Sequence, residues 1–143
     1  MSEPAFVYET TIVTTPERLW AALTSGELTR RYWFDRRIES DWKPGSPVRF
    51  YDGDSDRVTD HGEVLESDPP RRLAYTFHPD LGADHPAYGH YTRVAFDLEP
   101  LPGGVRLRLV HDRLMSPDDV EGWRQGWGPI LANLEKLFSS DSP

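Results

Sequence analysis

The amino-acid sequence predicts an α+β domain in which a curved antiparallel sheet of six to seven strands wraps around one long C-terminal helix, with two short helices after the first strand. Most of the chain between Phe6 and Asp112 alternates between apolar and polar residues, which is the pattern of strands with one buried face. After Ser116 the apolar residues recur every three or four positions, which is the period of a helix with one apolar stripe. Short segments rich in Pro, Gly and Asp separate the alternating stretches, so consecutive strands should pair as a meander.

The first strand and the two short helices lie in the N-terminal part of the chain. Phe6–Val13 alternates in the manner of a strand. Thr15 is suited to cap a helix and Pro16 is favoured at the first helical position, so we expect a helix that begins here and ends at Gly26. Residues 27–33 have the pattern of a second short helix.

Six further strands are expected before the long helix. They are predicted at Arg36–Trp42, Val48–Tyr51, Val58–Ser67, Arg72–His78, His90–Glu99 and Val105–Asp112. Tight turns should connect several of them, at Lys43–Gly45, Asp52–Asp54, Asp68–Pro70 and Pro100–Gly104. In the last strand Leu109 and His111 share the inward face, whereas Arg108 points outward.

The final helix carries an apolar stripe along about five turns. Its members are Val120, Trp123, Trp127, Ile130, Leu131, Leu134, Leu137 and Phe138. Pro129 removes one backbone donor and clashes with the carbonyl of Gln125, so we expect the helix to bend or break there. One helix covers only part of a concave face of six or seven strands, which leaves space for a ligand beside it.

Composition excludes several classes of protein. The 143 residues suit one domain, with an ordered core at about residues 6–138, and a net charge of −8 disfavours nucleic acid or an anionic membrane as partner. The chain has no cysteine, which excludes disulfides, thiolate metal sites and cysteine nucleophiles. We see no secretory signal and no apolar run of the ~18 residues that span a bilayer, so we expect a cytoplasmic protein.

Several stretches, in order, resemble a known family. They are Pro16–Thr24, Leu28 with Tyr32–Phe34, Gly62–Glu66 with Asp68–Leu73, Leu107–His111, and Gly126-Trp127 with Ile130-Leu131 and Asn133-Leu134. Together they resemble the homologues of the activator of heat-shock protein 90 ATPase, within the START-like (SRPBCC, Bet v 1-like) superfamily. The resemblance covers about residues 6–138. It implies a helix-grip fold over a single domain, residues 1–143, and often a hydrophobic cavity for a small molecule.

The resemblance leaves more than one function open. The eukaryotic founders of the family stimulate the chaperone ATPase with the help of an additional N-terminal domain, which we do not expect in this chain. We therefore predict a binding protein for a small apolar ligand, such as a lipid, an aromatic compound or a polyketide, acting as a monomer or weak homodimer. The alternatives are a chaperone-linked, stress-related interaction protein and a small-molecule enzyme of the cyclase or isomerase kind.

Large side chains on inward positions are the candidates to line the cavity. They are Trp33, Phe50, Tyr75, Phe77, His90, Phe96, Leu109, His111, Trp123, Trp127 and Ile130. Aromatic rings provide the broad apolar surface that binds a flat or lipidic ligand; any single one of them fits the packed core better, whereas the group as a whole indicates a partial cavity. His111 could serve as an acid or base near neutral pH, or it could be a hydrogen-bonded structural histidine.

Neither metal nor hydrolytic chemistry is indicated. Residues 78–90 contain three histidines and two carboxylates, but their spacing matches no recognised metal site, and the acidic residues 52–63 lack the glycine that a calcium loop needs. The carboxylates lie mostly at turns or on outward faces. No nucleophile elbow or phosphate-binding loop is present, so we expect no cofactor and assign no catalytic residue.

Overall fold

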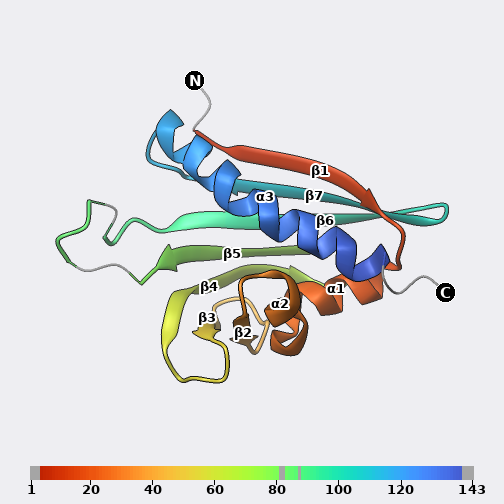
Figure 1. Cartoon of the computed structure of the whole chain (residues 1–143), viewed down its shortest axis with the longest axis horizontal. Helices are drawn as coiled ribbons and strands as arrows, with labels where there is room; N and C mark the ends of the chain where they lie inside the picture. Colours follow the sequence, from red (N-terminus) through yellow and green to blue (C-terminus); the bar gives the residue numbers. More distant parts are fainter. Residues whose placement is uncertain (1–3, 81–82, 87, 140–143) are drawn as a thin grey trace.

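A computed structural model describes residues 4–80, 83–86 and 88–139, and it consists of a seven-stranded antiparallel sheet with three helices (Figure 1). The strands are β1 (Phe6–Ile12), β2 (Arg36–Ser40), β3 (Pro47–Asp52), β4 (Val58–Asp68), β5 (Arg72–Pro79), β6 (Thr92–Leu101) and β7 (Gly104–Asp112). The helices are α1 (Pro16–Thr24), α2 (Gly26–Tyr32) and α3 (Pro117–Ser139). The predicted α+β helix-grip arrangement is confirmed.

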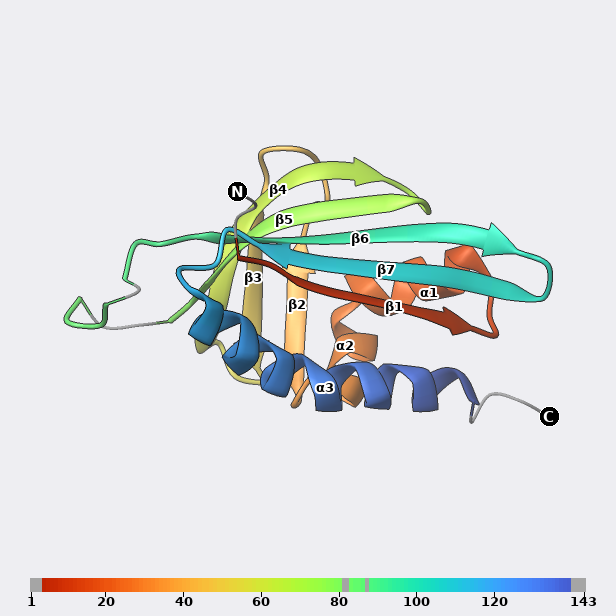
Figure 2. The same cartoon turned by 90° about the horizontal axis from the view of Figure 1, so that it is seen from above.

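Strands β2 to β7 form a meander in which each strand pairs with the next, and β1 pairs with the last strand, β7. The order is β1-β7-β6-β5-β4-β3-β2, so β1 pairs with β7 and the two edges are β1 and β2. Register shifts between Phe50 and Tyr51 and between Val64 and Glu66 mark bulges, which increase the bend of the strands that carry them. Viewed from above, the sheet curves over α3, and α1 and α2 close one side (Figure 2).

The β2 edge is covered by α2, and Thr29 joins the two. Its hydroxyl donates to the backbone oxygen of Arg36 at 2.8 Å and accepts from the backbone N–H of Ile38 at 3.2 Å. An exposed strand edge presents unpaired backbone groups, and a side chain that satisfies them removes that liability. The edge of the sheet beside the cavity is thereby closed.

Gly26 begins α2 instead of ending α1, contrary to the sequence prediction. Helix α1 ends at Thr24, and Ser25 lies between the two helices. A Cβ at position 26 would lie 2.7 Å from the backbone oxygen of Ile38. The glycine is therefore needed for close packing of α2 against β2, not for a left-handed helix end.

The strand bounds differ from the predicted ones by one residue at most, except in β2 and β6, where the difference is two residues. β2 ends at Ser40 because Trp42 has a φ of 57°, in the left-handed region that a strand cannot continue through. β6 begins at Thr92, which pairs with Phe77, so His90 and Tyr91 precede the strand. The ring of His90 instead meets the backbone oxygen of Arg113 at 2.6 Å, joining this loop to the segment before α3.

Helix α3 continues through Pro129 without interruption, so of the two outcomes expected there, a bend or a break, the break does not occur. Its direction changes near the middle, which is the gentler of the two expected outcomes (Figure 2). The buried residues are Trp127, Ile130, Leu131, Leu134 and Phe138, and all of them lie in its second half or just before it. Contacts with the sheet from this stripe compensate for the backbone hydrogen bond that proline cannot make.

Candidate functional site

Aromatic rings gather between α3 and the concave face of the sheet. Trp33, at the end of α2, lies 5.0 Å from both Phe50 and Trp127, measured between ring centroids. Phe77 on β5 contacts Phe50 at 5.5 Å and Trp123 at 5.6 Å. These tilted and edge-on arrangements are the favourable ones for aromatic pairs. Elements distant in sequence therefore share one apolar cluster.

A cavity of about 180 Å³ opens beside this cluster. It is lined by Trp33, Phe34, Arg36, Asp60, Phe77, Trp123, Gly126, Trp127 and Ile130. The walls come from the end of α2, strands β2, β4 and β5, and the first half of α3. Apolar side chains with two charged groups among them form the surface that a small organic ligand needs.

His111 belongs to the packed wall behind the cavity. The indole N–H of Trp127 donates to its Nδ1 at 3.0 Å, so Nε2 carries the proton and donates to Thr92 Oγ1 at 2.7 Å. Thr92 in turn donates to the backbone oxygen of Phe77 at 3.1 Å. Burial lowers the pKa of His111 to about 3, and nearby Asp112 opposes this only in part. The imidazole of His111 is thus held neutral in one tautomer, as in a hydrogen-bonded structural histidine and not in an acid or base.

Asp60 is a half-buried carboxylate that faces the cavity. Desolvation by burial raises its pKa, while a hydrogen bond from Thr59 and the charge of Arg36 act in the opposite direction. Thr59 Oγ1 donates to Asp60 Oδ2 at 2.8 Å and lies 3.3 Å from the backbone oxygen of Phe50, so it shares its one proton between two acceptors. Burial is the larger influence and favours the neutral acid.

Replacing Asp60 by Asn should raise the free energy of unfolding at pH 7 by roughly 0.5–2 kcal/mol. The folded-state pKa lies above the unfolded value of 3.8, so the stability that Asp60 contributes is complete below pH 3.8 and lost as the pH rises through the folded-state pKa. Urea denaturation at pH 7 and pH 3.5 measures the difference, which should disappear at the lower pH. Asp56→Asn, at an exposed position between β3 and β4, is the control and should change little. A loss of stability in Asp60→Asn at pH 7 would contradict the argument.

Phe34, at the rim of the cavity, lies with Asp35 in a turn of strained backbone. Phe34 and Asp35 both have left-handed φ angles, 48° and 58°, which cost roughly 1–2 kcal/mol each in a residue with a Cβ. The carboxylate of Asp35 accepts from Arg30 Nε at 2.7 Å, and its backbone oxygen accepts from the N–H of Gly53 at 2.9 Å. This turn leaves the ring of Phe34 56% exposed at the cavity mouth.

The structure brings most of the predicted site residues together but divides them into two groups. Those that line the cavity are Trp33, Phe77, Trp123, Trp127 and Ile130. Those buried in the packed core are Phe50, Tyr75, Phe96, Leu109 and His111. His90 lies apart from both groups, in the loop before β6.

Sequence reasoning missed four lining residues. They are Phe34, Arg36, Asp60 and Gly126. Asp60 is one of the carboxylates expected at turns or on outward faces, yet it pairs with buried Phe50 and shares its face. Its strand parity, the same as that of buried Val64, was the available signal. Gly126 lies one helical turn from Trp123 and from Ile130, and helical spacing places the three on one side.

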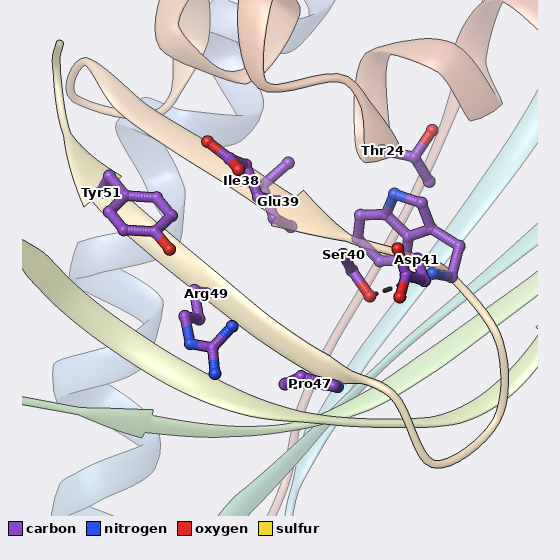
Figure 3. Close-up of a pocket in the computed structure, with 9 residues that line it drawn as sticks. Thr24, Ile38, Glu39, Ser40, Asp41, Pro47, Arg49 and Tyr51 are labelled. Carbon is purple, nitrogen blue, oxygen red and sulfur yellow. Dashed lines mark hydrogen bonds between the residues drawn. The ribbon is translucent and has the colours of Figure 1, made fainter. Parts of the chain in front are cut away.

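A larger hollow of about 350 Å³ lies elsewhere, along β2, β3 and their connection (Figure 3). It is lined by Thr24, Ile38, Glu39, Ser40, Asp41, Trp42, Pro47, Arg49 and Tyr51. In the close-up, Pro47, Arg49 and Tyr51 follow β3 while Glu39 and Ser40 lie on β2. The hollow is open to solvent and mostly polar, and the charged side chains in it are exposed. It has less of the character of a ligand site than the mainly apolar cavity beside α3.

The histidines of residues 78–90 do not converge within the described part of the chain. His78 donates from Nδ1 to the backbone oxygen of Pro79 at 2.6 Å and accepts at Nε2 from the N–H of Gly89 at 2.8 Å. Across the described ranges, no three potential metal-ligating side chains come together. No described helix combines the length and apolar character needed to span a membrane.

Comparison with known families identifies the domain. The model of the Activator of Hsp90 ATPase homolog 1-like protein family matches residues 13–139. The chain belongs to this family. The resemblance seen in the sequence is thereby confirmed, and no curated protein sequence matches the chain.

Solved structures agree with this family assignment in fold. Protein MLL2253 from Mesorhizobium loti is 28% identical with a TM-score of 0.80, over 97% of this chain and 99% of that one. An HSP90 activator from Plasmodium falciparum is 19% identical with a TM-score of 0.76, over 95% and 96%. The Aha1 dimer from Colwellia psychrerythraea is 18% identical with a TM-score of 0.73, over 94% and 95%. At 18–19% identity the last two are evidence for the fold alone.

Proposed function

We propose that this family member binds a small aromatic molecule in the cavity between α3 and the sheet. The observation that carries the proposal is a mainly apolar hollow whose wall includes Trp33, Phe77, Trp123 and Trp127. Rings that already pack against one another at their edges present flat faces to a ligand at little entropic cost, because their side chains are ordered beforehand.

The volume narrows the ligand class. An apolar cavity of roughly 150 Å³ accommodates benzene. Sites for drug-sized ligands have volumes of roughly 300–1,000 Å³. At about 180 Å³ the cavity matches one aromatic ring or a compact two-ring system, and it is small for a lipid or a large polyketide.

A chaperone-linked role is the second candidate, because the matching family model is named for activation of the Hsp90 ATPase. Its test is stimulation of a purified Hsp90 ATPase by this chain. Stimulation that persists when the cavity is filled by mutation would assign the function to a surface instead. Stimulation that requires an open cavity would connect the two roles.

Ligand binding can be tested through the five tryptophans, of which three line the cavity. In a titration of the ¹⁵N-labelled protein with 2-naphthol, the indole N–H signals of Trp33, Trp123 and Trp127 should shift. Trp20 and Trp42 are internal controls, and Trp42 lines the other hollow. Shifts confined to Trp42, or no shifts at all, would contradict the proposal.

Filling the cavity from the helix should abolish binding without unfolding the protein. Gly126 lines the cavity, and a Cβ built there meets no atom within 4 Å. Gly126→Leu should therefore weaken 2-naphthol binding by at least roughly tenfold while removing the ~1 kcal/mol helix penalty of glycine. Gly128→Leu is the matched control, on the same helix with equally open space, and should bind as wild type. Binding by calorimetry and melting temperature would be measured for both; equal affinities would place the ligand elsewhere.

A further inference from the structure

We propose that Asp60 and Arg36 form a polar recognition pair that selects phenolic ligands, with one hydroxyl group held between the carboxylate and the guanidinium. This inference rests on the proposed binding function and adds the chemical class of the ligand. Both residues line the cavity: Asp60 lies on β4 and Arg36 on β2, and β3 lies between these two strands in the sheet.

Asp60 supplies an acceptor that the protein itself does not use. Its Oδ2 is the partner of Thr59 Oγ1, and among the described residues no hydrogen bond to Oδ1 is present. A carboxyl oxygen accepts a hydrogen bond in either protonation state of the group. A half-buried acceptor in an apolar wall gains most from a ligand that brings a donor, because desolvation is then compensated.

Arg36 supplies donors at the same mouth. Among the described residues, its Nη1 makes only long contacts, 3.3 Å to the backbone oxygen of Phe34 and 3.5 Å to Asp52 Oδ1. The side chain is 32% exposed, and within the described ranges no salt bridge joins it to Asp60. The guanidinium therefore keeps N–H groups that can donate to an oxygen in the cavity.

A phenolic hydroxyl satisfies both groups at once, since its proton goes to Asp60 and its oxygen accepts from Arg36. A hydrocarbon of the same shape desolvates both polar groups and forms a hydrogen bond with neither. A carboxylate ligand can accept from Arg36 but brings no proton to Oδ1 of Asp60, and an ammonium ion can donate to Asp60 but is repelled by Arg36. The flat ring meanwhile fills the space among Trp33, Trp123 and Trp127.

The test compares two probes of nearly equal shape, 2-naphthol and 2-methylnaphthalene, on the full chain. Wild type should bind 2-naphthol more tightly by roughly tenfold or more, the effect of leaving buried polar groups unpaired. Calorimetry gives the affinities, and the indole signals of Trp33, Trp123 and Trp127 report whether both probes occupy the same cavity.

Two substitutions assign the preference to the pair. Asp60→Val and Arg36→Met should each reduce the affinity for 2-naphthol towards that for 2-methylnaphthalene, while 2-methylnaphthalene binds at least as well as to wild type. If Asp60→Val does not fold, Arg36→Met alone decides. A preference that survives in the folded variants overturns the inference.

The outcomes separate this inference from the function on which it rests. Equal affinities of wild type for the two probes, with the same indole shifts, would keep the aromatic cavity and reject the polar pair. Failure of both probes to shift the three cavity tryptophans would reject the binding function itself.

Discussion

Replacing Trp127 by alanine should lower the free energy of unfolding by about 3–5 kcal/mol, the range for removing a buried aromatic residue. The indole is 3% exposed and contacts the rings of Trp33 and Phe96 at 5.0 and 6.3 Å. Its removal would also leave Nδ1 of His111 as a buried acceptor without a donor. Chemical denaturation measures the loss. Trp42→Ala, which removes a half-buried indole away from α3, should cost clearly less, and an equal loss would be inconsistent with this account.

Trp127→Phe separates packing from hydrogen bonding. The ring and most of the contact area remain, but the donor to His111 is lost, so we expect a loss of about 1–3 kcal/mol. Combining this change with His111→Leu, which removes the acceptor, gives a double-mutant cycle in which the two losses should not add. Additive losses would mean that the indole and the imidazole do not interact energetically.

Acidification from pH 6.5 to pH 5 should destabilise the protein through His111 by about 1.4 kcal/mol per pH unit at most. The ordinary pKa is 6.5 and the folded-state pKa about 3, so the unfolded chain binds a proton in this window that the folded protein does not. The stability is fully present above pH 6.5 and lost as the pH falls towards 3. Urea denaturation at several pH values gives the slope.

His111→Asn should flatten this slope, because asparagine has no group that titrates in the window. Its carboxamide oxygen can still accept from the indole of Trp127. His85→Asn, at an exposed loop position, is the control and should keep the slope of wild type. The raised pKa of Asp60 makes its contribution to stability increase as the pH falls, opposite to that of His111. The effect of His111 is therefore measured as the difference in slope between wild type and variant, not from the wild-type curve alone. An unchanged slope in His111→Asn would show that another group dominates.

The order of elements was predictable because each element depends on local pattern. Apolar alternation, the cap at Thr15 and the stripe in α3 depend on residues close in sequence. The errors arose where a distant segment decides the backbone. Gly26 is set by Ile38 of β2, and Pro129 is tolerated because the apolar stripe of α3 holds the helix on the sheet. No local pattern contains that information.

The aromatic lining of the candidate site was predictable from the sequence, but its polar residues were not. Inward parity and helical spacing placed Phe77, Trp123 and Trp127 around one space. The same parity applied to Asp60, but a carboxylate was assumed to face solvent. Arg36 and Phe34 depend on the left-handed turn at residues 34–35, which has neither Gly nor Asn and gives no signal in the sequence.

The first half of α3 forms one wall of the cavity, and it contains Gly122, Gly126 and Gly128 before Pro129. Relative to alanine, three glycines and an internal proline disfavour helix by about 6 kcal/mol in total. Helical order in this half is therefore coupled to whatever it packs against, while the half that follows Pro129 is anchored by Leu131, Leu134 and Phe138. A ligand in the cavity and order in the first half stabilise each other by the same free energy, so a change in either one is transmitted to the other.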